Sequence, residues 1–336
     1  MRAWVLDEGT ETYRLGEEPE PTVGPWDVKV ELRASALNHL DLWVAKGLPK
    51  PPAYPHVPGA DGAGVVVDVG QAVEALSPGA EVVIDPSTSC GRCEACLAGD
   101  IPYCPSFAVI GEHRWGTHAE RVVVPGSNVS RKPEGLSWGH AAAFGLVVSS
   151  AVRMARRGKI GADSRVLIVG VGGGSAVAAF LVARSLGAQL FATSRTEAAR
   201  SWATELGAAV FESTGSYDER VRAATGGRGV DVVIDNVGTD TFERSLRSLA
   251  KGGRLVTNGS TTGRTAELSL PALFWRQLEV VGASMNDRSD FAEAARLVAG
   301  GDVVIPVGTP VPFEEYPDAL EQLRRGDQLG KLVLNR

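Results

Sequence analysis

The distribution of apolar and polar residues predicts two kinds of structure along the chain. In the first 125 residues, short apolar or alternating stretches are separated by turn residues, and they predict strands over 3–6, 26–33, 64–70, 80–84 and 118–124. After Pro125, alanine-rich helical stretches alternate with short apolar runs such as 166–169, 189–193 and 230–235. This alternation predicts a parallel sheet with crossover helices.

A glycine-rich turn lies at the centre of the second region. The apolar run 166–169 is followed by Gly170, Gly172, Gly173 and Gly174, and then by a helix-compatible run that ends near residue 187. Strand, glycine turn and helix are the start of a dinucleotide-binding unit, in which the glycines let a pyrophosphate approach the helix N-terminus. The last glycine of this pattern is replaced by Ala176, which is also small.

The four cysteines form the strongest local motif. Cys90, Cys93, Cys96 and Cys104 all fall within fifteen residues, and Gly91 and Gly99 allow tight turns between them. Four thiolates can bind one zinc ion in a tetrahedron, and a closed set of four leaves no position for substrate, so the zinc would be structural. An iron–sulfur cluster and metal-free reduced thiols are the alternatives.

Composition narrows the possible partners. A length of 336 residues suggests two domains, and the formal charge of −6 without a basic block argues against nucleic acid or an anionic membrane as partner. No apolar run reaches the length of a membrane span, and the N-terminal stretch lacks the apolar core of a signal peptide. We therefore expect a cytoplasmic protein that acts on a small molecule.

Taken together, these motifs resemble those of the medium-chain dehydrogenase/reductase family over essentially the whole chain. The resemblance rests on the N-terminal strands, the GADGAG motif at 59–64, the cysteine segment, the Gly170 turn and a closing strand at 330–334. It implies an α/β protein with a GroES-like β-rich catalytic domain (1–124 and 288–336). A Rossmann domain with a doubly wound parallel sheet (125–287) would bind the nicotinamide cofactor.

The resemblance also locates the positions at which zinc-using alcohol dehydrogenases of this family hold a catalytic zinc. Here these positions carry Asn38, Ala60 and Leu146, none of which can bind zinc through a thiolate or imidazole. An unusual metal site built from His39 and Asp61 is the alternative. The pattern Asn38-x-x-Asp41 is similar to that of the zinc-independent quinone oxidoreductase branch, in which the asparagine lies beside the nicotinamide.

Without a metal, another group must stabilise the charge that grows on the acceptor oxygen during hydride transfer. By motif position the candidate catalytic residues are Asn38, His39 and Ser150, with Asp41 and Asp61 as carboxylates that orient them. The alternatives are structural. His39 would then face solvent or bind a backbone carbonyl, and Asp41 would be a loop or helix-cap carboxylate.

The residues after the second strand of the dinucleotide-binding unit favour NADPH over NADH. This region reads Thr193-Ser194-Arg195-Thr196, without the carboxylate that usually binds the ribose hydroxyls of NAD. Ser194 and Arg195 can bind a 2′-phosphate, with Arg200 in reserve. Asn236 is a further predicted cofactor contact. One departure is Phe211, at a place where many NADPH-dependent quinone reductases have tyrosine.

The resulting prediction is an NADPH-dependent reductase that delivers hydride to a quinone, an enone or another α,β-unsaturated carbonyl, with one structural zinc and no catalytic metal. The first alternative is an alcohol dehydrogenase or carbonyl reductase that works without zinc or with an atypical zinc site. The second is a non-catalytic NADPH-binding protein. The family further implies a homodimer or homotetramer, assembled through the apolar edge strand at 278–283.

Overall fold

The computed structural model describes residues 1–336, which divide into two compact units. Unit 1 contains Met1–Ser149, Asn286–Gly300 and Ile305–Arg336. Unit 2 contains Ser150–Met285 and Gly301–Val304.

Unit 1 is built mainly from strands. Its strands are β1 (Arg2–Leu6), β2 (Tyr13–Glu17), β3 (Asp27–Ala36), β4 (Asp61–Val69), β5 (Glu81–Ile84), β6 (Ser87–Thr88), β7 (Ala108–Val109), β8 (Arg121–Pro125), β9 (Val129–Arg131), β16 (Val311–Pro312) and β17 (Val333–Asn335). Its helices are α1 (His39–Ala45), α2 (Glu94–Leu97), α3 (Trp138–Ala142), α10 (Arg288–Ala299) and α11 (Tyr316–Arg325), with short 3-10 turns at Ile101–Tyr103, Gly126–Asn128 and Phe313–Glu315.

The main sheet of unit 1 joins the two ends of the chain. Its strand order is β16-β17-β3-β4-β5-β9, and β8 also pairs with β3. The closing strand β17 is antiparallel to β3, with Val333 opposite Ala36, so it returns to the first domain as predicted. This pairing places the residues just before β17 next to those just after β3.

Unit 2 alternates strands and helices. Its strands are β10 (Arg165–Val169), β11 (Gln189–Ser194), β12 (Ala209–Glu212), β13 (Val230–Asp235), β14 (Leu249–Thr257) and β15 (Glu279–Gly282). Its helices are α5 (Gly174–Ser185), α6 (Glu197–Glu205), α7 (Tyr217–Ala224), α8 (Phe242–Ser248) and α9 (Leu270–Trp275), and α4 (Gly145–Gly158) runs from unit 1 into unit 2.

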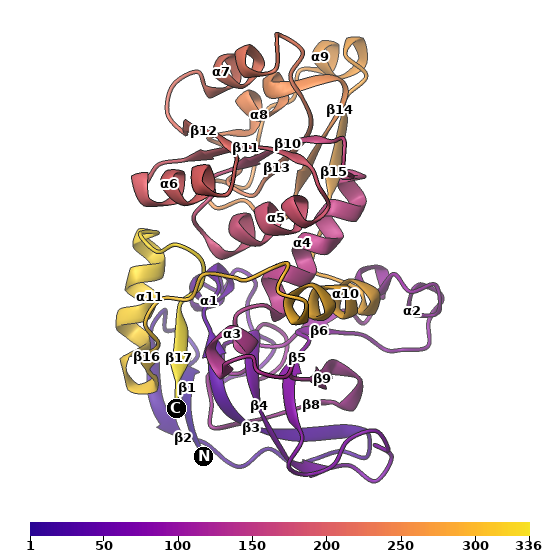
Figure 1. Cartoon of the computed structure of the whole chain (residues 1–336). Helices are drawn as coiled ribbons and strands as arrows, with labels where there is room; N and C mark the ends of the chain where they lie inside the picture. Colours follow the sequence, from indigo (N-terminus) through magenta and orange to yellow (C-terminus); the bar gives the residue numbers. More distant parts are fainter. The chain divides into compact units, whose positions relative to one another are not determined.

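All strand pairs of unit 2 are parallel, in the order β12-β11-β10-β13-β14-β15. The chain therefore winds outward from β10 first in one direction and then, from β13, in the other. Helices α5 and α6 lie on one face of this sheet, and α7 and α8 lie on the other (Figure 1). The predicted Rossmann fold is confirmed, and the direction reverses between β10 and β13, where such sheets bind ligands.

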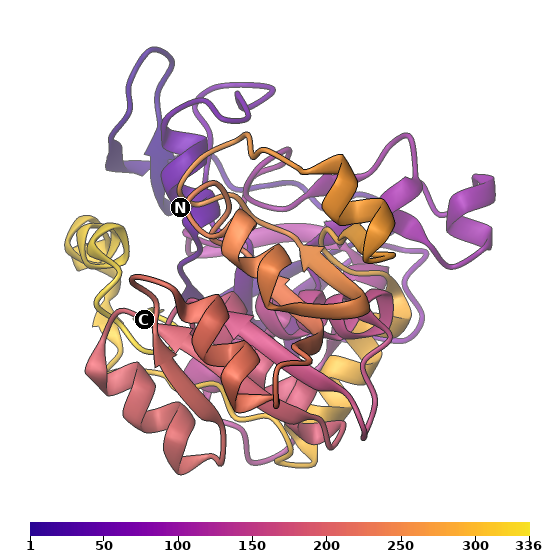
Figure 2. The same ribbon diagram turned by 90° about the horizontal axis from the view of Figure 1, so that it is seen from above.

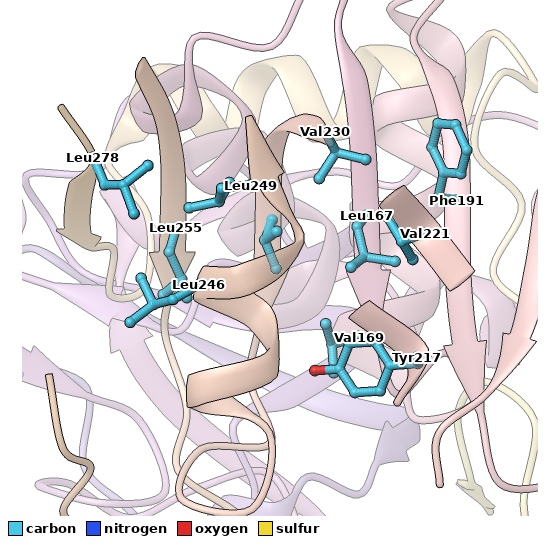
Figure 3. Close-up of a cluster of buried hydrophobic side chains, with 11 residues drawn as sticks. Leu167, Val169, Phe191, Tyr217, Val221, Val230, Leu246, Leu249, Leu255 and Leu278 are labelled. Carbon is cyan, nitrogen blue, oxygen red and sulfur yellow. The ribbon is translucent and has the colours of Figure 1, made fainter. Parts of the chain in front are cut away.

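A dry core on the α7–α8 face holds unit 2 together. Leu167, Val169 and Phe191 from the strands pack against Tyr217 and other side chains of the two helices (Figure 3). Tyr217 is fully buried, and its hydroxyl is within 3.1 Å of the Thr241 carbonyl oxygen. The buried ring thus keeps a partner for its polar end, as a buried tyrosine requires.

The boundary between the units differs from the predicted boundary at residue 124. Residues 125–149 pack within unit 1 because β9 pairs with β5 and α3 packs on β3 and β4. Residues 286 and 287 also belong to unit 1, since the Asn286 amide donates to Asp85 Oδ1 (3.0 Å) and accepts from Ser87 Oγ (2.8 Å). The predicted strand 118–124 begins only at Arg121, because His118 and Ala119 bond to β1 and to the loop before β4.

The segment with the four cysteines projects from the rest of unit 1, with α2 near its tip (Figures 1 and 2). Leu97 and Tyr103 in this lobe are exposed, and α2 buries none of its residues. Apolar burial therefore contributes little to its structure. No helix in the structure has the length and apolar character needed to cross a membrane.

Candidate functional site

The four cysteine sulfurs converge in the projecting lobe. Their Sγ atoms all lie within 4.8 Å of one another. Separations of 3.5 Å between Cys93 and Cys96, 3.6 Å between Cys90 and Cys104, and 3.9 Å between Cys90 and Cys96 define most of the cluster. A tetrahedron with zinc–sulfur bonds of about 2.3 Å has edges of about 3.8 Å. The four thiols therefore fit a single zinc ion, which would hold the lobe in place of an apolar core.

Backbone amides lie close to the sulfurs of this cluster. The N–H groups of Arg92 and Cys93 lower the pKa of Cys90 to about 6. The N–H of Cys96 lowers the pKa of Cys93, but burial and the neighbouring thiols outweigh it and raise that pKa to about 11. The backbone N–H groups of Cys90 and Ser106 lie 3.5 and 3.3 Å from Cys104 Sγ. Such amide–sulfur contacts orient the ligands of a metal site and stabilise their charge.

A second polar cluster forms where β3 ends and α1 begins. Asn38 is the N-cap of α1, and its backbone N–H donates to Asp41 Oδ2 (2.8 Å), while the Asp41 N–H donates to the Asn38 carbonyl oxygen (3.0 Å). This reciprocal pairing is a helix-capping arrangement. Asp41 thus acts as a cap carboxylate, and in that way it also fixes the backbone of Asn38.

Three distant segments meet at the carboxylate of Asp61. Lys331 Nζ donates to Asp61 Oδ2 (2.8 Å) and to Asn38 Oδ1 (2.5 Å). Asn38 Nδ2 donates to the same Asp61 Oδ2 (2.9 Å), and the backbone N–H of Leu146 donates to Asp61 Oδ1 (2.6 Å). Asp61 is 0% and Lys331 3% exposed, whereas Asn38 keeps 8%. Asn38 and Leu146 stand at two of the positions where the resemblance implies zinc ligands in zinc-using members of the family, and both are hydrogen-bonded here to the Asp61 carboxylate.

A buried histidine lies behind this cluster. His118 Nε2 is 3.5 Å from Asp41 Oδ2, and its Nδ1 is 3.0 Å from Ser35 Oγ. The imidazole ring also packs against the ring of Tyr316, with 4.8 Å between centroids. All three polar residues, Ser35, Asp41 and His118, are 0% exposed. These contacts hold the Asp41 carboxylate, which in turn caps the start of α1.

His39, the first residue of α1, is half-buried. The pKa of His39 is lowered, chiefly by burial and further by the positive charge of Lys331, whereas the charge of Asp41 raises it. The imidazole is therefore neutral at pH 7 and can donate or accept a hydrogen bond. Ser150 is buried in α4, in unit 2 rather than in unit 1 with the other candidates, and its catalytic role stays a prediction.

The structure disfavours the alternative metal site at His39 and Asp61. Both carboxylate oxygens of Asp61 already accept hydrogen bonds, and Lys331 places a positive charge 2.8 Å from one of them. A divalent cation on this carboxylate would face an ammonium group at short range. The cysteine cluster is where the structure groups at least three metal-binding side chains.

The glycine turn of unit 2 has the shape that a dinucleotide requires. Gly170 (φ 75°) and Gly172 (φ 148°) adopt backbone conformations that side chains disfavour, and Gly173 caps α5. A Cβ atom at Gly172 would lie 3.6 Å from the Ala199 side chain and 3.9 Å from Ser194 Oγ. A Cβ atom at Gly173 would meet nothing within 4 Å, so the turn lies beside the end of β11 and leaves open space at Gly173.

Two arginines lie at the end of β11, where a ribose would be bound. Ser194 is the last residue of this strand and is buried, and Arg195 is exposed. Arg200 Nη1 donates to the carbonyl oxygens of Ser194 (3.1 Å) and Arg195 (2.9 Å). Its guanidinium is thus fixed beside this turn, while the Arg195 side chain is available to a ligand.

Asn236, just after β13, has an unsatisfied donor. Its Oδ1 accepts from the Asn258 N–H (3.3 Å), but its buried Nδ2 has no partner. The neighbouring Asp235 carboxylate accepts from Val237, Gly238, Thr241 and Ser245, so the loop is firmly held. An orphaned amide at the carboxyl end of a central strand fits a contact to a cofactor. The residues of unit 2 therefore suit a nicotinamide dinucleotide.

Lys331 and His118 were not predicted as site residues. One feature of the sequence did point to Lys331: it is a single charged residue in the apolar stretch around the closing strand. A lysine in such a place is rarely buried without a partner. His118 had no signal, because its partners Ser35 and Asp41 are about eighty residues away in the chain.

Comparison with known protein families gives two matches. The family model of the alcohol dehydrogenase GroES-like domain matches residues 24–134, and that of the zinc-binding dehydrogenase matches residues 172–300. The first match lies within unit 1 and confirms the predicted GroES-like domain. The second begins within the glycine turn, at Gly172, and covers most of unit 2.

Three individual proteins are similar over nearly the whole chain. An NAD-dependent alcohol dehydrogenase of Sulfolobus acidocaldarius is 32% identical, and the match covers 99% of each chain. An acryloyl-coenzyme A reductase of Metallosphaera sedula is 28% identical, again over 99% of each chain. A crystal structure described as an NAD-dependent alcohol dehydrogenase is 40% identical, covers 100% of both chains and superposes with a TM-score of 0.95.

Proposed function

The chain belongs to the medium-chain dehydrogenase/reductase superfamily, among the zinc-type alcohol dehydrogenases, and from that premise we propose that it reduces the carbon–carbon double bond of an α,β-unsaturated carbonyl compound. The predicted family is confirmed, and the chain is a medium-chain oxidoreductase. Hydride would come from NADPH, and no catalytic metal would take part. Enones, quinones and unsaturated thioesters are the acceptors of this class.

The Asn38–Asp61–Lys331 cluster carries this proposal. At the family's catalytic-zinc positions the chain has an amide and a leucine, and Lys331 places an ammonium 2.5 Å from that amide. Alcohol oxidation needs a group that stabilises an alkoxide, for which a metal ion is well suited. Reduction of an unsaturated carbonyl spreads negative charge over an enolate, which hydrogen-bond donors can stabilise. The similarity to an acryloyl-coenzyme A reductase agrees with this choice.

The protein's own side chains would position the acceptor. A nicotinamide bound at the Gly170 turn would supply the hydride. Asn38 and the neutral His39 are the donors that would bind the carbonyl oxygen, and Asp41 holds the backbone from which both project. Ser150 is a further donor in this proposal.

NADPH is proposed as the cofactor because Arg195 and Arg200 surround the end of β11 and no carboxylate follows it before Glu197. Arg195→Ala should weaken NADPH binding by about 1–3 kcal/mol, the usual range for a hydrogen bond to a charged group. NADH binding should be nearly unchanged. Titration of both cofactors by fluorescence, with Arg184→Ala in the neighbouring helix as control, tests this. Equal losses for the two cofactors would refute the assignment.

The function is tested by the position of an isotope label. NADPH deuterated at its transferable hydrogen should place deuterium on the β-carbon of a simple enone, and mass spectrometry of the saturated product locates it. Elemental analysis of the same sample should give one zinc per chain. Deuterium on the carbinol carbon, or two zinc ions per chain, would contradict the proposal.

A second candidate function is alcohol dehydrogenation, which the names of two similar proteins favour. It predicts oxidation of primary or secondary alcohols with NAD or NADP and no reaction with enones. Tight cofactor binding without turnover of alcohols, aldehydes, quinones or enones would instead indicate a non-catalytic cofactor-binding protein.

We also propose that the chain forms homo-oligomers through β15. This strand is an unpaired edge of the unit 2 sheet, and Val280 on it is 40% exposed. Phe274 and Trp275 of the preceding helix are also exposed. Light scattering should show a dimer or tetramer, and Val280→Lys should shift it toward the monomer. A monomeric wild type would exclude this assembly.

A further inference from the structure

The orientation of the Asn38 amide is fixed by its two charged neighbours. An ammonium group can only donate hydrogen bonds and an ionised carboxylate can only accept them. The oxygen of the amide must therefore face Lys331 and its NH₂ group must face Asp61, at the observed 2.5 and 2.9 Å. The reverse orientation would place the NH₂ group against the ammonium. Lys331 and Asp61 together specify a single orientation.

One N–H of the Asn38 amide remains available. Its first N–H donates to Asp61, and its second has only the Ala36 carbonyl oxygen at 3.5 Å, a long and weak contact. Asn38 is also the member of the cluster that keeps contact with its surroundings, with 8% of its surface exposed against 0% for Asp61 and 3% for Lys331. Asn38 is therefore the residue of the cluster that a ligand could contact, while the Asp61–Lys331 ion pair stays buried.

A cation on the amide oxygen strengthens the N–H groups at the other end of the amide. Hydrogen bonds in a chain polarise one another, and the effect is larger in a buried, low-dielectric environment.

Gly330 (φ 83°) makes this placement of Lys331 possible, since a Cβ atom there would lie 2.0 Å from the Pro306 carbonyl oxygen. The backbone N–H of Lys331 donates to that same oxygen (2.9 Å).

We propose that Lys331 is a positioning residue for hydride transfer, which acts through Asn38. It fixes and polarises the amide, so that the second N–H of Asn38 Nδ2 donates to the acceptor oxygen as negative charge develops there. This inference rests on the proposed function. It assigns to a buried ammonium and an amide the stabilising role that a metal ion has in zinc-using members of the family.

A kinetic double-mutant cycle on the full-length protein tests this relay. Asn38→Ala removes the donor and leaves the Lys331–Asp61 pair intact, and it should lower kcat for enone reduction about 100-fold, as does loss of an oxyanion donor in other enzymes. Lys331→Met should lower kcat by about 10-fold or more. In the Asn38→Ala background, Lys331→Met should cause no further loss, because its effect passes through the missing amide. If Lys331→Met lowered kcat by the same factor in the wild type and in Asn38→Ala, the inference would be overturned.

Substituent effects give a readout that a purely structural role would not change. Across a series of aryl enones, kcat of both single variants should rise more steeply with electron-withdrawing substituents than kcat of the wild type. Without the hydrogen bond from Asn38, the enone itself must stabilise more of the developing negative charge. The KM for NADPH should stay unchanged. Lys132→Met is the control, since Lys132 binds Glu81 and the Leu136 carbonyl oxygen elsewhere in unit 1. Unchanged steepness in the Lys331 variant would overturn the inference.

The two proposals fail separately. If the wild type reduces aldehydes and no enones, the proposed function is wrong, and the same cycle on substituted benzaldehydes decides the role of Lys331. If Lys331→Met does not fold, Lys331→Arg keeps a buried donor to Asn38 and should retain more activity than Asn38→Ala. An arginine variant as inactive as Asn38→Ala would count against the relay, and a wild type that reduces neither acceptor would overturn both proposals.

Discussion

The cysteine cluster and the Asn38–Asp61–Lys331 cluster solve the same problem in different ways. Each joins segments that would otherwise be loosely held. The cysteines come from one stretch of fifteen residues in an exposed lobe, and their sulfurs fit a metal ion. In the second cluster, a buried ion pair joins Asp61 and Lys331, which lie 270 positions apart in the chain. A lobe without an apolar core needs a metal, whereas a segment that a sheet already holds needs only complementary charges.

The largest effect should come from the cysteine cluster. Structural zinc in small domains contributes on the order of 10 kcal/mol to local folding. Cys96→Ser should therefore lose the bound zinc and make residues 90–104 sensitive to protease, while the Asn38 cluster stays intact. Elemental analysis and mass spectrometry of the cleavage products measure both effects. Retention of one zinc per chain by Cys96→Ser would show that the cluster does not work as four equal ligands.

Breaking the buried ion pair should have the next largest effect. Lys331→Met leaves the Asp61 carboxylate buried without its cation, which typically costs 3–5 kcal/mol in the free energy of unfolding. The double variant Asp61→Asn, Lys331→Met should regain part of this loss, because no charge is then buried alone. Urea unfolding measures the values, and Lys132→Met, whose partner Glu81 is half-exposed, should cost about 1 kcal/mol. If Lys331→Met lowered the free energy of unfolding no more than Lys132→Met does, the Asp61–Lys331 pair would not be needed for stability.

Asp85 shows what a buried carboxyl does when no cation donates a hydrogen bond to it. Its Oδ1 accepts from two neutral donors, Ser87 N and Asn286 Nδ2, each at 3.0 Å. Burial raises its pKa to about 7, and the charge of Asp287 adds to this, against these hydrogen bonds and the charge of Arg288. The folded state therefore binds this proton more tightly than the unfolded chain. The stabilisation is complete below about pH 4 and is lost as the pH rises to about 7.

This difference should be visible in the pH dependence of stability. Relative to the wild type, Asp85→Asn should gain up to about 4 kcal/mol between pH 4 and pH 8, because 3 pKa units correspond to about 4 kcal/mol. Urea unfolding at several pH values measures the change. A flat difference for Asp85→Asn would mean that its carboxylate is stabilised by some other charge.

An exposed ion pair should matter least. Glu8 and Lys50 lie 3.4 Å apart, with side chains 72% and 68% exposed. Glu8→Gln should change the free energy of unfolding by less than about 0.5 kcal/mol, since water and salt screen such pairs. A cost similar to that of Lys331→Met would remove burial as the explanation for the strength of the Asp61–Lys331 pair.

The same contrast explains how much could be predicted from the sequence. The cysteine site was visible because all four cysteines are close together in the chain, and β10 was visible because it contains the unbroken apolar run 166–169. The domain boundary was not, since the short strand β9 and helix α3 carry weak patterns and belong to unit 1 through pairing with β5, β3 and β4. The role of Asp61 required knowing which cation β17 brings beside β3. Pairing between distant strands leaves no trace in local periodicity.

The pairing of β17 with β3 also has a consequence for biosynthesis. On the ribosome, the cysteine segment can bind its metal as soon as residue 104 has emerged, long before unit 2 is made. Asn38 and Asp61 emerge earlier still, but their cation is translated almost 270 codons after Asp61. A chain that stops before Lys331 could therefore carry its zinc and form the Rossmann sheet, and would still leave the Asp61 charge unpaired. Completion of the Asn38–Asp61–Lys331 cluster therefore requires synthesis through residue 331.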